Sequence, residues 1–312
     1  MLKQIHFVSR IDNTNAGDIW SSPLWYYYHF FQQYNIVRHD IGDILWNKIS
    51  KDDVVIIGGG GLINLSDVWN ININKLFDTK ATIIGWGIGF NTHYDMSYPN
   101  TYLDMNRFDL VGIRDFAHLS NLSYLPCVSA FLPDLKKKKN IKRKIGVIEH
   151  KDYPITSENL SCYEKINNSY TIQKITDFIA SSEIIVTNTY HITYWAQLMC
   201  KKVIIVDKFS SKFDCFKHKP CFYSGNIEKD IENTIINENC YLEAVELNNI
   251  FFEKVKQITK TKIEKKASRI RCVCNKVKIV FWLNENKKKI YTNLVRYTIR
   301  VINKIMRILI LF

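Results

Sequence analysis

The chain has 312 residues, of which 46% are hydrophobic and 23% charged, and this composition argues against a mainly disordered protein and allows two domains with separate cores. Its net charge is +13, yet residues 254–312 alone hold 17 Lys and Arg against two acidic residues, so the rest of the chain is slightly acidic. A body that bound nucleic acid would carry the positive charge itself, so no nucleic-acid partner is expected.

Apolar, β-branched segments alternate with helical patterns through the first half of the chain. Strands are expected at residues 5–8, 53–57, 82–85 and 110–113, and helices at residues 22–34 and 102–108. Such alternation is typical of a parallel sheet with helices on both faces. The sequence therefore predicts a Rossmann-like α/β domain at residues 1–135.

A lysine-rich segment, residues 136–144, follows this domain. Like charges in succession repel one another and extend a chain, so a solvated linker is favoured over a phosphate-binding site. Further strands are expected at residues 145–148, 183–187 and 202–207, and a helix at residues 190–200. These patterns predict a second Rossmann-like α/β domain at residues 145–250.

Residues 251–312 are predicted to form a basic, helical tail. From residue 291 onward, apolar side chains recur at near-helical spacing with Arg and Lys between them, a pattern that favours an amphipathic helix on an anionic membrane surface. Its charges are too frequent for a membrane span, and packing of its apolar face onto a domain is the alternative. Because the N-terminus lacks an apolar secretion signal, we expect a cytoplasmic protein that is peripheral on the inner face of the membrane.

The eight cysteines form no CxxC pair and are not followed by zinc-ligand spacing. Reduced, packed thiols are therefore the expected state. The acidic residues form no cluster that predicts a required metal, and no cofactor is expected.

Glycine-rich segments follow two of the strands expected in the first domain. The first segment has four consecutive glycines, Gly58, Gly59, Gly60 and Gly61, and the second is centred on Gly87. Glycines at the carboxyl end of a strand leave backbone N–H groups accessible, which suits an anion, although close backbone packing is the alternative. Adjacent strand ends predict that both segments line one cleft.

Three polar side chains of the first domain also lie just beyond strands or at a helix start. Asn15 and Asp18 follow the first strand, where Asp18 can cap a helix or bind a sugar hydroxyl. Arg114 ends the fourth strand, where its planar fork suits a carboxylate or phosphate, with pairing to Asp115 as the alternative. Trp20, in an aromatic segment, is a candidate for stacking on a sugar, although such residues are more often core.

The second domain offers a histidine and two lysines at strand ends. His191 lies between a strand and a helix start, where imidazole can act as general acid or base or contact an anion. Lys208 and Lys212 follow the next strand and are interpreted as a phosphate clamp or as part of a solvated loop.

Taken in order, these motifs resemble the polysaccharide pyruvyl transferase family over about residues 1–215. They are an N-x-G-D loop, a strand that ends in glycines, a G-x-G-x-G segment, an Arg-Asp strand end and T-x-x-x-H. The resemblance implies two facing Rossmann-like domains, as in GT-B-like glycosyltransferases. It also implies phosphoenolpyruvate as donor substrate, a sugar of a surface polysaccharide or its lipid-linked precursor as acceptor, and a pyruvate ketal as product.

By position, the resemblance assigns the family's histidine to His191, its donor loop to the four glycines, and its arginine to Arg114. This chain has Thr189 and Ile192 where many members have Arg and Gly, so either Lys208 or Lys212 supplies the missing cation or the donor differs. In the implied reaction His191 is the catalytic acid or base, with Asp18 as base on the acceptor side.

Two alternative functions remain open at the level of sequence. A GT-B-type glycosyltransferase that uses a nucleotide sugar has the same architecture and similar glycine loops. A catalytically silent, membrane-associated scaffold of a glycan assembly complex is also consistent with the missing arginine and the basic tail. The acceptor sugar, its linkage and the oligomeric state are not encoded in any of these motifs.

Overall fold

The computed structural model describes residues 4–116 and 122–261. Met1–Thr259 form one compact unit, and Lys260–Phe312 are assigned to a second. The amphipathic helix expected at residues 291–312 lies outside the described residues. Within the described ranges, no helix combines the length and the apolar character needed to cross a bilayer.

The first sheet of the compact unit is built from the N-terminal part of the chain, and all its strand pairs are parallel. Its strands in spatial order are β2 (Asn35–Asp40), β1 (Gln4–Ser9), β3 (Val54–Gly58), β5 (Thr82–Phe90), β6 (Leu110–Ile113) and β7 (Ser123–Tyr124), and β4 (Gly61–Ile63) pairs with the end of β5. Neighbouring parallel strands must be joined by crossover connections, and the helices that cover the sheet lie in such connections.

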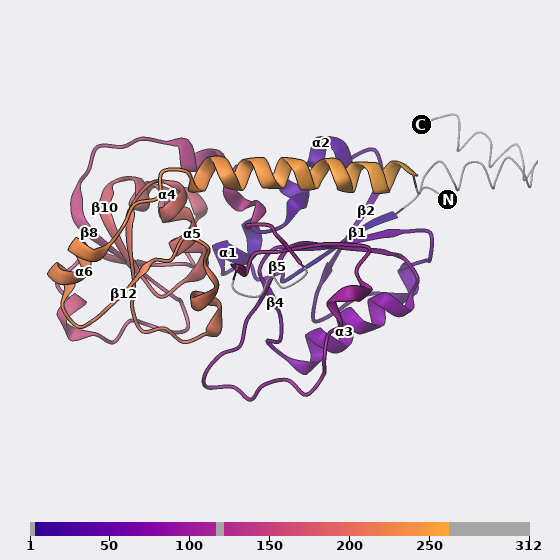
Figure 1. Cartoon of the computed structure of the whole chain (residues 1–312), viewed down its shortest axis with the longest axis horizontal. Coiled ribbons are helices and arrows are strands. Elements are labelled where there is room, and N and C mark those ends of the chain that lie inside the picture. Colours follow the sequence, from indigo (N-terminus) through magenta and orange to yellow (C-terminus); the bar gives the residue numbers. More distant parts are fainter. Residues whose placement is uncertain (1–3, 117–121, 262–312) are drawn as a thin grey trace, which may run out of the picture. The chain divides into compact units, whose positions relative to one another are not determined.

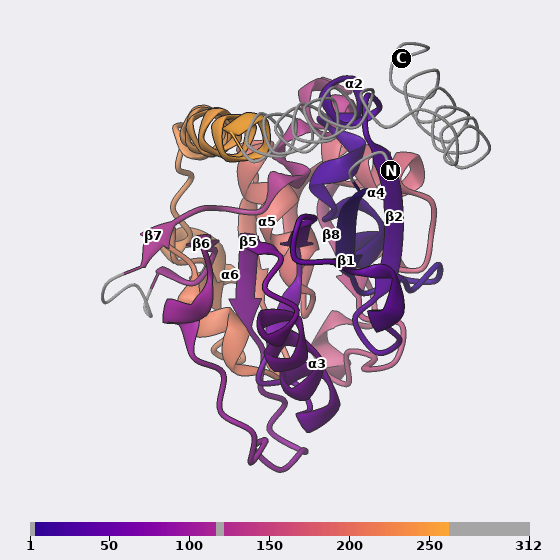
Figure 2. The same cartoon turned by 90° about the vertical axis from the view of Figure 1, so that its right-hand side faces the viewer.

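Alternation of side chains along the strands gives the first sheet two buried faces. In β3, Val55 and Ile57 pack with residues of α3 (Asp67–Asp78), whereas Val54 and Ile56 pack on the opposite face with Phe31 of α2 (Tyr28–Phe31). Figure 2 shows α3 lying against the strands of this sheet. Burial on both faces explains why these strands read as continuous apolar runs.

The second sheet is also parallel and follows the same plan. Its order is β12 (Cys221–Phe222), β11 (Lys202–Ile205), β10 (Ser182–Thr187), β8 (Arg143–Glu149) and β9 (Lys165–Asn167). Apolar residues of α4 (Ile172–Ala180) and α5 (Tyr190–Leu198) cover one face, and α6 (Ile227–Asn233) contributes Ile227 to the other. The structure is therefore a mixed α/β protein with parallel, Rossmann-like sheets.

A long helix that begins at residue 240, drawn in orange in Figure 1, follows the second sheet in the chain yet packs on the first. Phe252 stacks on Tyr27, with ring centres 4.1 Å apart, and the buried Asn248 accepts a hydrogen bond of 2.8 Å from Nε1 of Trp86. Residues 251–259 of the predicted tail therefore belong to the compact unit, and Phe251, Phe252 and Val255 lie in its core.

The structure confirms all seven strands expected from the sequence, although the bounds of most of them differ by one to five residues. Two helix predictions were wrong. Residues 22–34 form only the short turn η1 (Pro23–Trp25) and α2, and residues 102–108 contain only the single turn η3 (Met105–Arg107). Residues 136–142 of the expected linker are exposed, and β8 begins at Arg143. Because residues 4–259 lie in one compact unit, the predicted domain boundaries remain a prediction.

Candidate functional site

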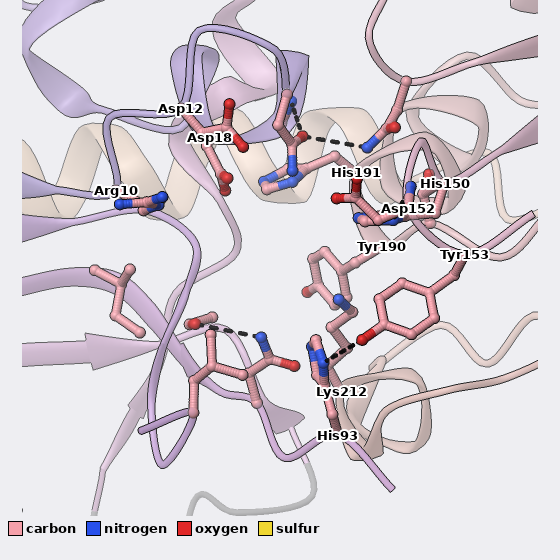
Figure 3. A pocket seen from close by; sticks show the side chains of 18 of the residues that line it. Arg10, Asp12, Asp18, His93, His150, Asp152, Tyr153, Tyr190, His191 and Lys212 are labelled. Atoms are coloured by element: carbon pink, nitrogen blue, oxygen red, sulfur yellow. Dashed lines mark hydrogen bonds between the residues drawn. The ribbon is translucent and has the colours of Figure 1, made fainter. Parts of the chain in front are cut away.

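A cavity of about 600 Å³ lies where the carboxyl ends of strands from both sheets meet. Its polar lining includes Arg10 and Asp18 beyond β1, Asn91 and His93 beyond β5, Arg114 beyond β6, His150 and Lys151 beyond β8, His191 beyond β10 and Lys212 beyond β11. Figure 3 shows Asp12 and Asp18 on one side of this cavity, and Lys212, His93 and Tyr153 on the other. Ligands of open parallel sheets bind at this edge, because loops diverge there and leave a crevice.

Arg114 is the most deeply buried cation of the cavity wall, with only 2% of its surface exposed. Its guanidinium carbon lies 3.8 Å from the centre of the Tyr190 ring. No hydrogen-bond partner within the described residues reaches its Nε or Nη1. A buried guanidinium with free N–H groups is costly without an anion, so its position beside a cavity indicates an anion-binding wall.

Lys212 lines the cavity from the turn η8 (Ser211–Cys215), whereas Lys208 does not. Burial lowers the pKa of Lys212 from 10.5 to about 7, and the positive charge of Arg114 acts in the same direction. Lys208 instead forms an ion pair of 2.9 Å with Asp214. Of the two lysines expected at the site, only Lys212 is available to a ligand in the cavity.

Asn15 and Asp18 lie together at the short helix α1 (Ala16–Trp20). The Asn15 side chain caps this helix by accepting a hydrogen bond of 3.0 Å from the N–H of Gly17. Asp18 is thereby left to face the cavity, where burial raises the pKa of its carboxyl to about 6 against the lowering effect of Lys212. Trp20 is not part of the cavity lining and packs against the core beside α5.

His191 is the second residue of α5, whose N-terminus is capped by Thr189. Gly17 packs closely on its ring, since a Cβ added to that glycine would lie 2.3 Å from Nδ1. Burial lowers the pKa of His191 well below 6.5, and the charges of Arg114 and Lys212 add to this effect. The ring is therefore neutral at neutral pH while no anion occupies the cavity.

The glycines that follow β3 have different surroundings. Gly61 lines the cavity, and a Cβ there would lie 2.9 Å from Nη2 of Arg114. Gly59 has a φ of +68° and packs on the backbone of Ser21, and its N–H donates to the carbonyl of Trp86. Gly58, Gly60 and Gly87 also lie outside the cavity lining. At Gly58 and Gly59 the glycines serve close packing, the alternative that the sequence left open.

Direct contacts join the loops of the two sheets around the cavity. Ser210 donates a hydrogen bond of 2.6 Å to Oδ1 of Asn91, and Lys151 forms an ion pair of 3.2 Å with Asp12. The Tyr153 hydroxyl, beyond β8, lies 3.4 Å from Nδ1 of His93, beyond β5. These contacts hold loops from both sheets in a defined arrangement around the cavity.

Several cavity residues were not anticipated from the sequence. Arg10, Asp12, His93, His150, Lys151 and Tyr153 all line the cavity. Arg10 and His150 come directly after strands that the sequence does predict, so the strand-end argument that singled out Arg114 applies to them as well. Burial lowers the pKa of His150 to about 4, which keeps this side chain neutral.

The chemistry of this cavity is that of a site for an anion and an oxygen-rich ligand. Arg114 and Lys212 supply positive charge, Asp18 supplies a carboxyl group that titrates near neutral pH, and His191 supplies a neutral imidazole. In the part of the chain that the structure describes, no group of three His, Cys, Asp or Glu side chains is arranged to hold a metal ion.

Comparison with known proteins gives one family. Residues 5–207 match the family model described as polysaccharide pyruvyl transferase. Among curated protein sequences, none is significantly similar to the chain. A solved structure of a functionally uncharacterized protein from Klebsiella pneumoniae subsp. pneumoniae NTUH-K2044 is similar with 17% identity and a TM-score of 0.43, over 72% of this chain and 93% of that one.

Proposed function

The chain belongs to the polysaccharide pyruvyl transferase family, and from this premise we propose that it transfers the pyruvyl group of phosphoenolpyruvate to a sugar of a surface polysaccharide or of its lipid-linked precursor. Family membership makes the protein a transferase that modifies polysaccharides. The donor, the acceptor and the roles of individual residues are part of the proposal.

The observation that carries the choice of donor is the buried guanidinium of Arg114 in the cavity wall, with Nε and Nη1 available. Phosphoenolpyruvate has a carboxylate and a phosphate, and each presents oxygen pairs that suit a planar fork of donors. Lys212, in the same cavity, supplies the second cation. This lysine takes the place of the arginine that many family members have at the position of Thr189, which here caps α5.

The reaction balances without a cofactor. A proton adds to the methylene carbon of the enol, one sugar hydroxyl attacks the carbon that becomes electron-poor, and the bond to the phosphate oxygen breaks. A second hydroxyl of the same sugar closes the ketal. The two hydroxyl hydrogens end on the new methyl group and on the released phosphate, and fixed cations stabilise the charge that develops there.

His191 and Asp18 are the proposed proton-transfer residues. Burial lowers the pKa of His191, and the charges of Arg114 and Lys212 lower it further. A bound donor anion offsets these charges, so donor binding raises the pKa of the imidazole toward the range of an effective acid. Asp18 lies across the cavity from Lys212 and is ionised above about pH 6, as a base for the acceptor hydroxyl requires.

For the architecture, we propose that the two parallel sheets form the facing Rossmann-like domains of a GT-B-like enzyme. The cavity lined from the carboxyl ends of both sheets supports this assignment. The basic segment beyond residue 253 is proposed to hold the enzyme at an anionic membrane surface, where lipid-linked acceptors reside.

The experiment compares ligands on the purified full-length chain. Phosphoenolpyruvate should bind and should be consumed only when a sugar acceptor is present, whereas binding of UDP-glucose alone would favour a glycosyltransferase. Mass spectrometry of the glycan from cells with and without the chain checks the product, for which ketal formation predicts about 70 additional mass units per repeat. Absence of turnover with every acceptor, despite correct folding, would support the scaffold alternative.

A further inference from the structure

Behind the His191 ring, three side chains form a hydrogen-bonded series that the proposed reaction does not use. Trp195 donates from Nε1 to Oγ of Ser129 over 2.9 Å. Ser129 donates from Oγ to Sγ of Cys127 over 3.2 Å. The sulfur of Cys127 lies 3.6 Å from Nε2 of His191.

Trp195 sets the direction of the hydrogen bonds in this series. An indole N–H can only donate, so the Ser129 hydroxyl accepts from Trp195 and directs its own hydrogen onward to sulfur. The sulfur of Cys127 thus accepts a hydrogen bond from Ser129, and its own S–H is left to donate to the next atom in line. The nearest acceptor for that S–H is Nε2 of His191, and a hydrogen bond in this direction requires a lone pair on Nε2.

The three side chains of the series are buried. Trp195 and Ser129 are fully buried, and Cys127 is 1% exposed. The hydroxyl of Tyr194 also donates to the backbone carbonyl of Cys127 over 2.8 Å, which fixes the backbone beside the sulfur. Burial raises the pKa of the Cys127 thiol, so the sulfur retains its hydrogen at neutral pH.

We propose that Trp195, Ser129 and Cys127 are positioning residues that fix the neutral His191 ring with its hydrogen on Nδ1. That nitrogen adjoins Gly17 in the cavity wall, so the ring presents a hydrogen-bond donor there and not a lone pair. A donor at Nδ1 suits the oxygen atoms of an anionic substrate. The inference deepens the proposed function of His191, but the position of the hydrogen is a property of the empty protein.

The test is ¹⁵N nuclear magnetic resonance of the full-length chain labelled at histidine, at a pH where His191 is neutral. The eight histidines are distinguished by the signal that disappears in His191→Gln. We expect Nδ1 of His191 to carry the hydrogen and Nε2 to show the shift of an unprotonated nitrogen. A hydrogen on Nε2 in the intact chain would overturn the proposal, without any need for a further variant.

Two variants at Cys127 test whether its thiol determines which nitrogen of His191 carries the hydrogen. Cys127→Ala removes the donor and should lower the ratio of Nδ1–H to Nε2–H forms by about three- to tenfold, the effect of one hydrogen bond. Cys127→Ser restores a donor and should restore the ratio, and Cys240→Ala, at a buried cysteine outside the cavity lining, should leave it unchanged. An unchanged ratio in folded Cys127→Ala would overturn the role of the thiol.

Kinetics separate this inference from the proposed function. With phosphoenolpyruvate as donor, Cys127→Ala should lower kcat by a similar factor, change KM less, and be rescued by Cys127→Ser. If the intact chain consumes no phosphoenolpyruvate, the proposed function fails while the resonance experiment still decides where the hydrogen lies.

Discussion

The guanidinium of Arg114 rests on the face of the Tyr190 ring, 3.8 Å from its centre. An aromatic face stabilises a cation through the electrons of the ring and leaves the N–H groups of that cation free. A carboxylate in the place of the Tyr190 ring would accept hydrogen bonds from the N–H groups of Arg114. Tyr190 therefore supports the charge of Arg114 and keeps its hydrogen-bonding capacity available to a ligand.

Substitution of Arg114 should weaken ligand binding without lowering the stability of the fold. Arg114→Met should weaken phosphoenolpyruvate binding by about 100-fold, the effect of losing a pair of charge-assisted hydrogen bonds. Because the variant also removes a buried charge with unsatisfied N–H groups, its Tm should stay level or rise. Titration and thermal unfolding measure the two effects. A marked drop in Tm would show that the guanidinium is needed by the fold itself.

Lys212 should make donor binding depend on pH. Its pKa of about 7 means that the empty protein loses this charge as the pH rises, whereas a bound anion favours the charged form. Affinity should therefore fall by up to about tenfold per pH unit above pH 7. Lys212→Arg, whose charge does not titrate, is the matched control, and any slope common to both proteins belongs to the ligand. Identical profiles for the two would contradict the assignment.

Asp18→Asn should lower kcat by about 10²–10⁴-fold, as expected on loss of a general base. In the intact enzyme kcat/KM should fall as the pH drops below about 6, where Asp18 of the free enzyme becomes protonated, and the variant should lack this acid limb. Folding raises the pKa of this carboxyl from 3.8 to about 6, so its ionised form costs stability at neutral pH. The variant should therefore be at least as stable as the intact chain at pH 7, and a large loss of stability would point to a structural role.

Gly17→Ala should disturb His191 selectively. The added Cβ would lie 2.3 Å from Nδ1, a distance at which the imidazole must move. We expect kcat to fall at least tenfold, which corresponds to a loss of roughly 1.4 kcal/mol at the transition state. In the His191→Ala background the same substitution should have little further effect, because coupled residues are not additive. Full additivity of the two changes would contradict the contact.

Removal of residues 291–312 tests the proposed membrane tail. The intact chain should sediment with vesicles that contain anionic lipid, and binding should weaken as salt is added, because charges at a surface are screened within about 8–10 Å at physiological salt. The truncated chain should remain in the supernatant. Equal sedimentation of the two chains would assign membrane contact to another surface.

The strands could be predicted because both sheets are buried on two faces, which produces runs such as Val54–Gly58. The edge strand Asn35–Asp40 carries Arg and His among its apolar residues and lacks such a run. Helix α3 was missed because its sequence is rich in asparagine. Asn72 nevertheless fits inside, since its amide donates to the carbonyl of Ile41 over 2.7 Å, a partner that no local pattern reveals.

Some features of the cavity could likewise be predicted from the sequence, and others could not. The sequence predicts one cavity edge for four side chains, because each follows a strand or opens a helix and parallel strands end on the same side. These are Asp18, Arg114, His191 and Lys212, and all four line the cavity. The difference between Lys208 and Lys212 could not be predicted, since it depends on how a turn directs Asp214 toward Lys208. The close approach of Gly17 to His191 likewise joins residues from two separate sheets.

The helix that begins at residue 240 has a consequence for synthesis of the protein. Phe251, Phe252 and Val255 complete the same core cluster as Ile5, Phe7 and Leu24, so this core cannot close until more than 220 further residues have been synthesised after Leu24. Until then the nascent chain carries an uncovered aromatic patch around Tyr27 and Trp86. Such surfaces favour aggregation and attract chaperones. Folding of the first sheet is thus coupled to translation of residues 251–255, and a fragment that stops before residue 251 lacks part of this core.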